Sequence, residues 1–95
     1  MKIIAVCGMG IGTSVLLKMN TEKVLTLLGV TAEVQAADIT TAKREAHVAD
    51  IIMTTPELVF QLENMPGKIV AIDHVFDLVE IREKLSGALG ELGKL

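Results

Sequence analysis

The chain has 95 residues, of which 51% are hydrophobic, and 9 Lys and Arg stand against 12 Asp and Glu, giving a net charge of −3. These values predict one compact globular domain spanning residues 1–95 and exclude a disordered chain. The sequence has no basic run, no Trp and no Tyr, so a protein that binds nucleic acid is not expected.

Hydropathy and cysteine content indicate where the protein works. The apolar stretches are much shorter than the ~20 residues of a membrane span, so no direct membrane insertion is expected. The single cysteine cannot form an internal disulfide, which is typical of a reducing compartment. We therefore expect a cytoplasmic protein.

The chain begins with a strand, a glycine-rich stretch and a helix. Lys2–Val6 is a nearly continuous apolar run, as in a strand buried on both faces. Residues 7–14 follow, and a helix is predicted for residues 15–28, with Thr13 or Ser14 as its N-cap and Gly29 just after its end. Asn20 falls on the apolar side of this helix, and we expect its amide to hydrogen bond to a neighbouring loop. That apolar side is predicted to consist of Leu16, Leu17, Val24, Leu27 and Leu28.

The rest of the chain alternates between strand and helix patterns. The predicted elements are, in chain order, an edge strand at 32–37, a helix from Thr40 or Thr41 to 47, a strand at 50–54, a helix at 55–64, a strand at 68–72 and a helix from about 77. Gly87 and Gly90 should weaken the last turns of the final helix.

This alternation predicts an α/β fold of the flavodoxin-like or Rossmann-like kind. Four parallel strands in the order 2-1-3-4 should carry helices on both faces, joined by right-handed crossovers. Such sheets bind ligands at the carboxyl ends of their strands. The polar or reactive residues expected at that edge are Cys7, Asp38, Thr54, Thr55, Asp73 and His74.

The stretch Cys-Gly-Met-Gly-Ile-Gly-Thr-Ser, directly after the first strand, has the composition of an anion site. Three glycines let the backbone turn and point N–H groups inward, and the following helix adds unpaired donors and the positive end of its dipole. The residues predicted to bind phosphate are Gly8, Met9, Gly10, Ile11, Gly12, Thr13 and Ser14.

Cys7 stands at the start of this stretch and is the candidate nucleophile. Backbone amides and a helix N-terminus lower a thiol pKa, here to an expected value of about 4–7. The same donors could then stabilise the oxygens of a phosphorylated sulfur. The alternative is an inert cysteine buried for packing.

Other phosphate motifs fit less well. A Walker A loop needs a lysine that the stretch lacks, and the glycines do not have Gly-x-Gly-x-x-Gly spacing. With one cysteine there is no metal-ligand or Cys-x-x-Cys spacing, so neither a metal nor a cofactor is expected. A low-molecular-weight cysteine phosphatase or arsenate reductase has Cys-x5-Arg, but Thr13 occupies the arginine position, and Arg44 and Arg82 lie on predicted helices away from the loop.

Residues 1–28, including Val-Cys-Gly-Met-Gly-Ile-Gly-Thr-Ser-Val-Leu-Leu-Lys-Met, resemble the IIB components of the bacterial phosphoenolpyruvate-dependent sugar phosphotransferase system. The likeness is greatest to the ascorbate type, with galactitol and cellobiose types further off, although Ile11 and Thr13 replace the expected Gln and Ser. The resemblance implies a phosphotransferase in which Cys7 takes a phosphoryl group from a phosphohistidine on IIA. It also implies transfer from Cys7 to a sugar, ascorbate or a similar carbohydrate, held by the membrane protein IIC. A flavodoxin-like module that only binds a phosphorylated ligand remains a non-enzymatic alternative.

Other polar and apolar residues near the expected site have simpler interpretations. His74 is expected to be structural or solvated more readily than functional, and His47 to lie on the surface. Asp38 and Asp73 should cap turns, because carboxylates close to Cys7 would raise its pKa. Thr54 and Thr55 should cap the third helix. Met9 and Ile11 could form a docking patch for IIA and IIC.

Overall fold

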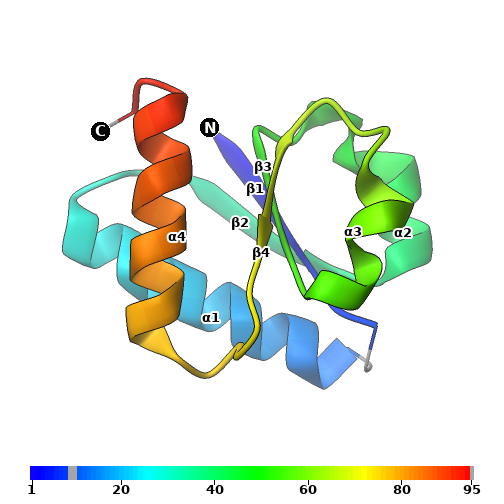
Figure 1. Cartoon of the computed structure of the whole chain (residues 1–95), viewed down its shortest axis with the longest axis horizontal. Coiled ribbons are helices and arrows are strands. Elements are labelled where there is room, and N and C mark those ends of the chain that lie inside the picture. Colours follow the sequence, from blue (N-terminus) through cyan, green and yellow to red (C-terminus); the bar gives the residue numbers. More distant parts are fainter. Residues whose placement is uncertain (9–10, 95) are drawn as a thin grey trace.

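The computed structural model describes residues 1–8 and 11–94, apart from the side chains of Ile11 and Ala46 (Figure 1). Strands and helices alternate along the chain as the sequence predicts. The elements are β1 (Lys2–Val6), α1 (Ile11–Leu28), β2 (Glu33–Ala37), α2 (Ile39–Glu45), the 3₁₀ turn η1 (Ala46–Val48), β3 (Ile51–Thr54), the 3₁₀ turn η2 (Pro56–Leu58), α3 (Val59–Leu62), β4 (Lys68–Ala71) and α4 (Leu78–Glu91).

The four strands form one parallel sheet in the order β2-β1-β3-β4, which confirms the predicted topology. Val6 is in register with Ala37 on one side and with Thr54 on the other, and Thr54 is in register with Ala71. The carboxyl ends of all four strands therefore meet at one edge, as parallel pairing requires.

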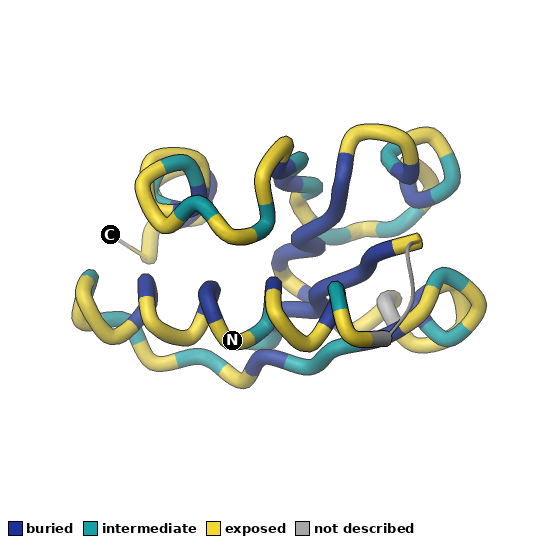
Figure 2. Tube along the Cα trace, turned by 90° about the horizontal axis from the view of Figure 1, so that it is seen from below, coloured by how far each residue is buried: buried dark blue, intermediate teal, exposed yellow. Residues whose placement is uncertain are grey.

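Helices α1 and α4 cover one face of the sheet, and α2 and α3 cover the other (Figure 1). In β1, alternate side chains point to opposite faces, so Ile3, Ala5 and Cys7 join the core under α1 and α4. Ile4 and Val6 join the second core, under α2 and α3. Figure 2 shows the buried strands enclosed by helices whose outer turns are exposed.

The first helix starts earlier than predicted. α1 begins at Ile11, which places Thr13 and Ser14 inside its first turn, so the prediction that one of them is the N-cap is wrong. The prediction failed because glycines suggest a loop, whereas Gly12 adopts helical backbone in the first turn of α1. Leu16 and Leu27 are also 39% and 65% exposed, whereas Leu25, which was not assigned to the apolar side, is buried.

Two predicted features of α1 are confirmed. Gly29 has a φ of 71° and ends the helix in a Schellman motif, in which the Val30 N–H donates to the Leu25 carbonyl and the Gly29 N–H to the Thr26 carbonyl. The Asn20 Nδ2 donates to the Val75 carbonyl over 2.7 Å, so the buried amide fastens α1 to the loop between β4 and α4.

The remaining helices differ from prediction mainly at their ends. Asp38, rather than Thr40 or Thr41, caps α2, because its Oδ1 accepts the Thr41 N–H at 2.7 Å. α2 ends at Glu45 before η1, and α3 ends at Leu62. α4 begins after Asp77, as expected, and continues through both of its glycines to Glu91.

Candidate functional site

Cys7 lies directly after β1, at the carboxyl edge of the sheet. Its side chain is 3% exposed and belongs to the core between the sheet and helices α1 and α4. The next residue, Gly8, is exposed. Met9 and Gly10 of the predicted phosphate-binding stretch, and the side chain of Ile11, lie outside the described residues, as does the docking patch predicted for Met9 and Ile11.

The N-terminus of α1 begins four residues after Cys7. The N-terminus of a helix presents N–H donors and the positive end of the helix dipole, and the 18-residue helix α1 directs this end toward the same edge. Gly12 is exposed, Thr13 is half-buried and Ser14 is completely buried. A Cβ built on Gly12 meets no described atom within 4 Å, so the backbone here is open to a ligand.

The other helical segments that start at this edge carry their own anion at the N-terminus. Asp38 caps α2, Glu57 lies in η2, and Asp77 caps α4 with Glu80 in its first turn. In contrast, the first turn of α1 contains no acidic residue. Because a helix N-terminus favours negative charge, the first turn of α1 differs from these segments in having no acid of its own.

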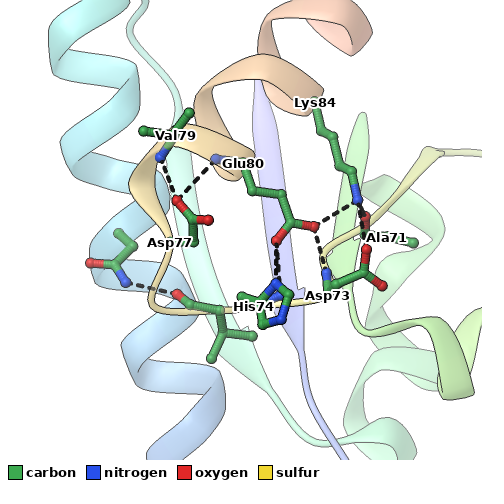
Figure 3. Close-up of polar contacts among 9 residues, drawn as sticks. Ala71, Asp73, His74, Asp77, Val79, Glu80 and Lys84 are labelled. Carbon is green, nitrogen blue, oxygen red and sulfur yellow. Dashed lines mark hydrogen bonds and ion pairs between the residues drawn. The ribbon is translucent and has the colours of Figure 1, made fainter.

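Glu80 organises the loop between β4 and α4 (Figure 3). Its carboxylate accepts the backbone N–H of Asp73 at 2.6 Å and of His74 at 2.9 Å, and it pairs with Lys84 at 2.6 Å. Partial burial raises the pKa of Glu80, but the bonds from Lys84 and the two backbone groups outweigh this effect and lower the pKa to about 2. The loop is therefore fixed by an ionised side chain of the chain itself.

His74, Asp77 and Glu80 lie close enough to hold a metal ion, since their ligand atoms are all within 4.8 Å of one another. However, Asp77 accepts the N–H groups of Val79 and Glu80, and Glu80 is engaged as described above. His74 lies 3.4 Å from Glu80 and packs edge-on against Phe76. These contacts explain the cluster as part of the loop structure.

The pKa of the Cys7 thiol is raised to about 11, so the prediction of a lowered pKa is wrong for the described structure. Burial is the main cause, and the negative charge of Glu57 adds to it. The sequence showed the donors of the glycine loop but not that the sulfur packs into the core. At neutral pH the thiol is protonated.

Glu57 is the charged residue at this site that the sequence pattern did not reveal. It lies in η2, the turn that follows β3, and its Oε1 accepts the Thr55 hydroxyl at 2.7 Å. Leu58 in the same turn packs against the start of the loop, because a Cβ added to Gly8 would lie 3.3 Å from Leu58 Cδ2. An acid just after a Thr-Pro helix start, at the carboxyl end of a strand, was the available signal.

The other predicted edge residues are used structurally. Thr54 donates its hydroxyl to the Val6 carbonyl at 2.9 Å, and the Thr55 hydroxyl goes to Glu57, so neither side chain caps α3 as predicted. Asp73 pairs with Lys84 at 3.4 Å instead of capping a turn. The capping role of Asp38 is confirmed, and its pKa is lowered first by the backbone bond from Thr41.

The two histidines and the two arginines contact no phosphate-loop residue in the described contacts. His47 lies exposed in η1 and the side chain of His74 is 61% exposed, which agrees with their expected surface positions. Arg44 and Arg82 are exposed on α2 and α4. A surface groove of about 440 Å³ lies between β4 and α4, but Cys7 does not line it.

The structure is thus a flavodoxin-like α/β sheet in which a cysteine at the carboxyl end of β1 is followed by a helix whose first turn is free of acids. Residues 2–86 match the family model described as "PTS system, Lactose/Cellobiose specific IIB subunit". The chain therefore belongs to this family of IIB subunits of the sugar phosphotransferase system (PTS). It is a phosphotransferase component that carries phosphoryl groups, a function that implies interaction with IIA and IIC proteins.

Two individual proteins illustrate the relationship. The chain is 41% identical over 88 residues to the ascorbate-specific PTS system EIIB component of Mycoplasma pneumoniae, covering 92% of this chain and 93% of that protein. The lactose-specific IIB component domain of Streptococcus pneumoniae superposes with a TM-score of 0.63 over 99% of this chain and 95% of that chain. At 21% identity, this structural match supports the fold alone. No described helix is long and apolar enough to cross a membrane.

Proposed function

We propose that Cys7 is the residue that carries the phosphoryl group. It receives this group from a phosphohistidine on IIA and passes it to a carbohydrate bound by IIC, in the cytoplasm. The observation that carries the proposal is the position of Cys7, at the carboxyl edge of the sheet and four residues before the N-terminus of α1, whose first turn contains no acid. Family membership supports the relay.

The phosphate cradle of this proposal is residues 8–14. The exposed backbone of Gly8 and Gly12 allows close approach of phosphoryl oxygens, and the first-turn N–H groups of α1 supply donors. The half-buried Thr13 adds a hydroxyl, and the buried Ser14 lies one residue further into the helix. Met9, Gly10 and Ile11 complete the stretch by sequence.

Transfer from IIA requires Cys7 to lose its proton. The sulfur–phosphorus bond forms as the phosphorus–nitrogen bond of the phosphohistidine breaks, and the thiol proton goes to the released imidazole nitrogen, directly or through water. In the second step a substrate hydroxyl attacks phosphorus, the sulfur leaves, and the hydroxyl proton returns to it. The raised pKa of Cys7 favours the protonated thiol as the resting form.

The substrate of this relay is ascorbate or a similar carbohydrate. This part of the proposal comes from the ascorbate-specific relative, which is 41% identical to the chain.

A cysteine phosphatase is the competing reaction at such a loop. Thr13 occupies the position of the phosphatase arginine and can offer only a neutral hydrogen bond. Charge-assisted hydrogen bonds are roughly twice as strong, so a loop without a guanidinium stabilises attack by water less well. Phosphocysteine in this protein should therefore hydrolyse slowly and transfer quickly when IIC is present.

The experiment supplies phosphoenolpyruvate, the general phosphotransferase proteins and the cognate IIA, and measures the intact mass of this chain. The wild type should gain one phosphoryl group, located on Cys7 by peptide mapping, and Cys7→Ser should gain none. His47→Gln and His74→Gln serve as controls and should be phosphorylated normally. A phosphoryl group on either histidine in the wild type contradicts the proposal.

Stability of the phosphorylated protein separates carrier from phosphatase. Isolated phospho-Cys7 protein should keep its phosphoryl group in neutral buffer and lose it rapidly on addition of membranes containing IIC and the substrate. If water removes the group as fast as these membranes do, the relay is wrong and the phosphatase reading is favoured.

A further inference from the structure

The turn η2 is packed against the beginning of the phosphate loop. Thr54, the last residue of β3, donates its hydroxyl to the carbonyl of Val6, the residue before Cys7. Leu58, the last residue of η2, approaches Gly8, with 3.3 Å between an added Gly8 Cβ and Leu58 Cδ2. The segment that carries Glu57 therefore contacts the residue before Cys7 through Thr54 and the residue after Cys7 through Leu58.

The carboxylate of Glu57 is exposed and accepts a hydrogen bond within its own turn. Its Oε1 accepts the Thr55 hydroxyl at 2.7 Å, and this bond is the main reason why the pKa of Glu57 is lowered. Among the residues that the structure describes, Glu57 is the only charged side chain whose field raises the pKa of Cys7. Asp38 and Asp73, the acids considered from sequence, contribute no such effect.

We propose that Glu57 is a positioning residue whose fixed negative charge opposes any anion on Cys7 and thereby keeps the phosphoryl group easy to pass on. This inference rests on the proposed phosphorylation of Cys7. The neutral thiol has no net charge for Glu57 to repel, whereas the phosphorylated sulfur carries up to two negative charges. Repulsion therefore destabilises the phosphorylated form alone and favours release of the group to the next acceptor.

The first arm of the test measures Cys7 directly, without any phosphoryl donor. Iodoacetamide should alkylate Glu57→Gln roughly two- to fivefold faster than the wild type at neutral pH, because less repulsion gives more thiolate. Glu57→Asp, which keeps the charge, should return the rate toward the wild type. Glu63→Gln is the matched control, since it removes the same charge from an exposed position at the end of α3.

The second arm measures the phosphoryl equilibrium. Phosphorylated IIA and each variant are mixed, and the fraction of phosphorylated chain is read by intact mass. Glu57→Gln should shift the equilibrium roughly three- to tenfold toward phospho-Cys7, and Glu63→Gln should not. The difference between wild type and Glu57→Gln should shrink in 1 M salt, where charges are screened within about 3 Å, as a purely structural effect would not.

The outcomes separate this inference from the proposed function. The inference is supported if Glu57→Gln raises both the alkylation rate and the fraction of phosphorylated chain. Glu57→Asp should then return the alkylation rate toward the wild type, and 1 M salt should reduce the difference in phosphorylation. If wild-type Cys7 is phosphorylated normally but Glu57→Gln behaves like the wild type in either arm, the inference is wrong and the proposed function stands. A wild type that gains no phosphoryl group on Cys7 overturns both.

Discussion

Helices α1 and α4 lie on the same face of the sheet and both begin at its carboxyl edge, but their N-termini are treated in opposite ways (Figure 1). The N-terminus of α4 is filled by the chain, with Asp77 on the N–H groups of Val79 and Glu80, and Glu80 on those of the preceding loop. The first turn of α1 has no acid at all. The same physical preference for an anion is thus used for stability at α4, and under the proposed function it serves the phosphoryl group at α1.

The comparison teaches where to look for a phosphate site among several equivalent helix ends. A carboxylate in the cap or first turn stabilises a helix by about 0.3–1 kcal/mol, so its absence has a cost. At α1 the stabilising acid is missing where the sequence has several glycines and a neighbouring cysteine. Under the proposed function, an incoming phosphoryl group takes the place of the missing acid.

The largest effect is expected when α1 is given an acid of its own, which removes the difference between its N-terminus and that of α4. Thr13→Asp places a carboxylate in the first turn of α1, where it satisfies the helix end and repels a phosphoryl group. Phosphorylation of Cys7 by IIA should fall more than tenfold at equilibrium, while the free energy of unfolding stays equal or rises by about 0.3–1 kcal/mol. Intact mass and urea unfolding measure the two quantities.

Thr13→Asn is the matched control for this variant, since it has nearly the same shape without the charge. It should be phosphorylated almost as well as the wild type. If Thr13→Asp accepts the phosphoryl group normally, the N-terminus of α1 is not the cradle and the contrast with α4 loses its functional meaning.

The reverse experiment removes the acid from the filled helix end. Glu80→Ala deletes the acceptor for two backbone N–H groups and the partner of Lys84, so the free energy of unfolding should fall by roughly 2 kcal/mol. Urea unfolding at neutral pH measures the loss. Phosphorylation of Cys7 should be retained in the folded protein, because Glu80 belongs to the other helix end.

The pH dependence of the free energy of unfolding tests whether Glu80 stabilises the start of α4 as an ionised carboxylate. The pKa of Glu80 is about 2 in the folded protein against an ordinary value of 4.5, so its contribution is fully present above pH 4.5 and is lost as pH falls through about 2. The wild type should lose this contribution across that interval, and the difference between wild type and Glu80→Ala should narrow there. A difference that stays constant down to pH 2 would exclude an ionic role for Glu80.

The sheet topology and the position of Cys7 at the carboxyl edge of the sheet were predictable because they depend on periodicity and on the place of glycines in the chain. Alternating apolar patterns gave four strands in the order that the structure has, and the strand ends placed Cys7 and its loop at the correct edge. Asn20 was also correctly expected to bond to a loop, because a buried amide must find a partner.

The errors arose where a contact between distant segments decides the outcome. Whether the pKa of the Cys7 thiol is lowered or raised depends on its burial under α1 and α4 and on Glu57, which is 50 residues away in sequence. Neither influence can be seen in the pattern of residues 7–14. The cap of α2 shifted from Thr40 or Thr41 to Asp38 by one local hydrogen bond. Such choices among adjacent polar residues are settled by geometry rather than by composition.

A smaller effect on stability and phosphorylation is expected when one glycine in each helix is replaced by alanine. Cβ atoms built on Gly87 in α4 and on Gly12 in α1 both meet no described atom within 4 Å. Gly87→Ala should raise the free energy of unfolding by about 0.5–1 kcal/mol, because glycine is unfavourable inside a helix, and should leave phosphorylation unchanged. Gly12→Ala should lower phosphorylation by IIA, since its methyl group would occupy the phosphate approach. Equal phosphorylation of both variants would show that Gly12 is not needed by the ligand.

The smallest expected effect concerns the buried sides of the two helices. The buried side of α4 is apolar, whereas α1 buries Asn20 and Thr21, and the Thr21 hydroxyl has no hydrogen-bond partner among the described residues. Thr21→Val replaces that hydroxyl by a methyl group of similar size, so the free energy of unfolding should rise by about 0.5–1 kcal/mol. Asn20→Leu is the contrasting variant and should lower it, because the Val75 carbonyl loses its donor. Thermal unfolding measures both, and a Thr21→Val protein less stable than the wild type would mean that the hydroxyl is bonded in solution.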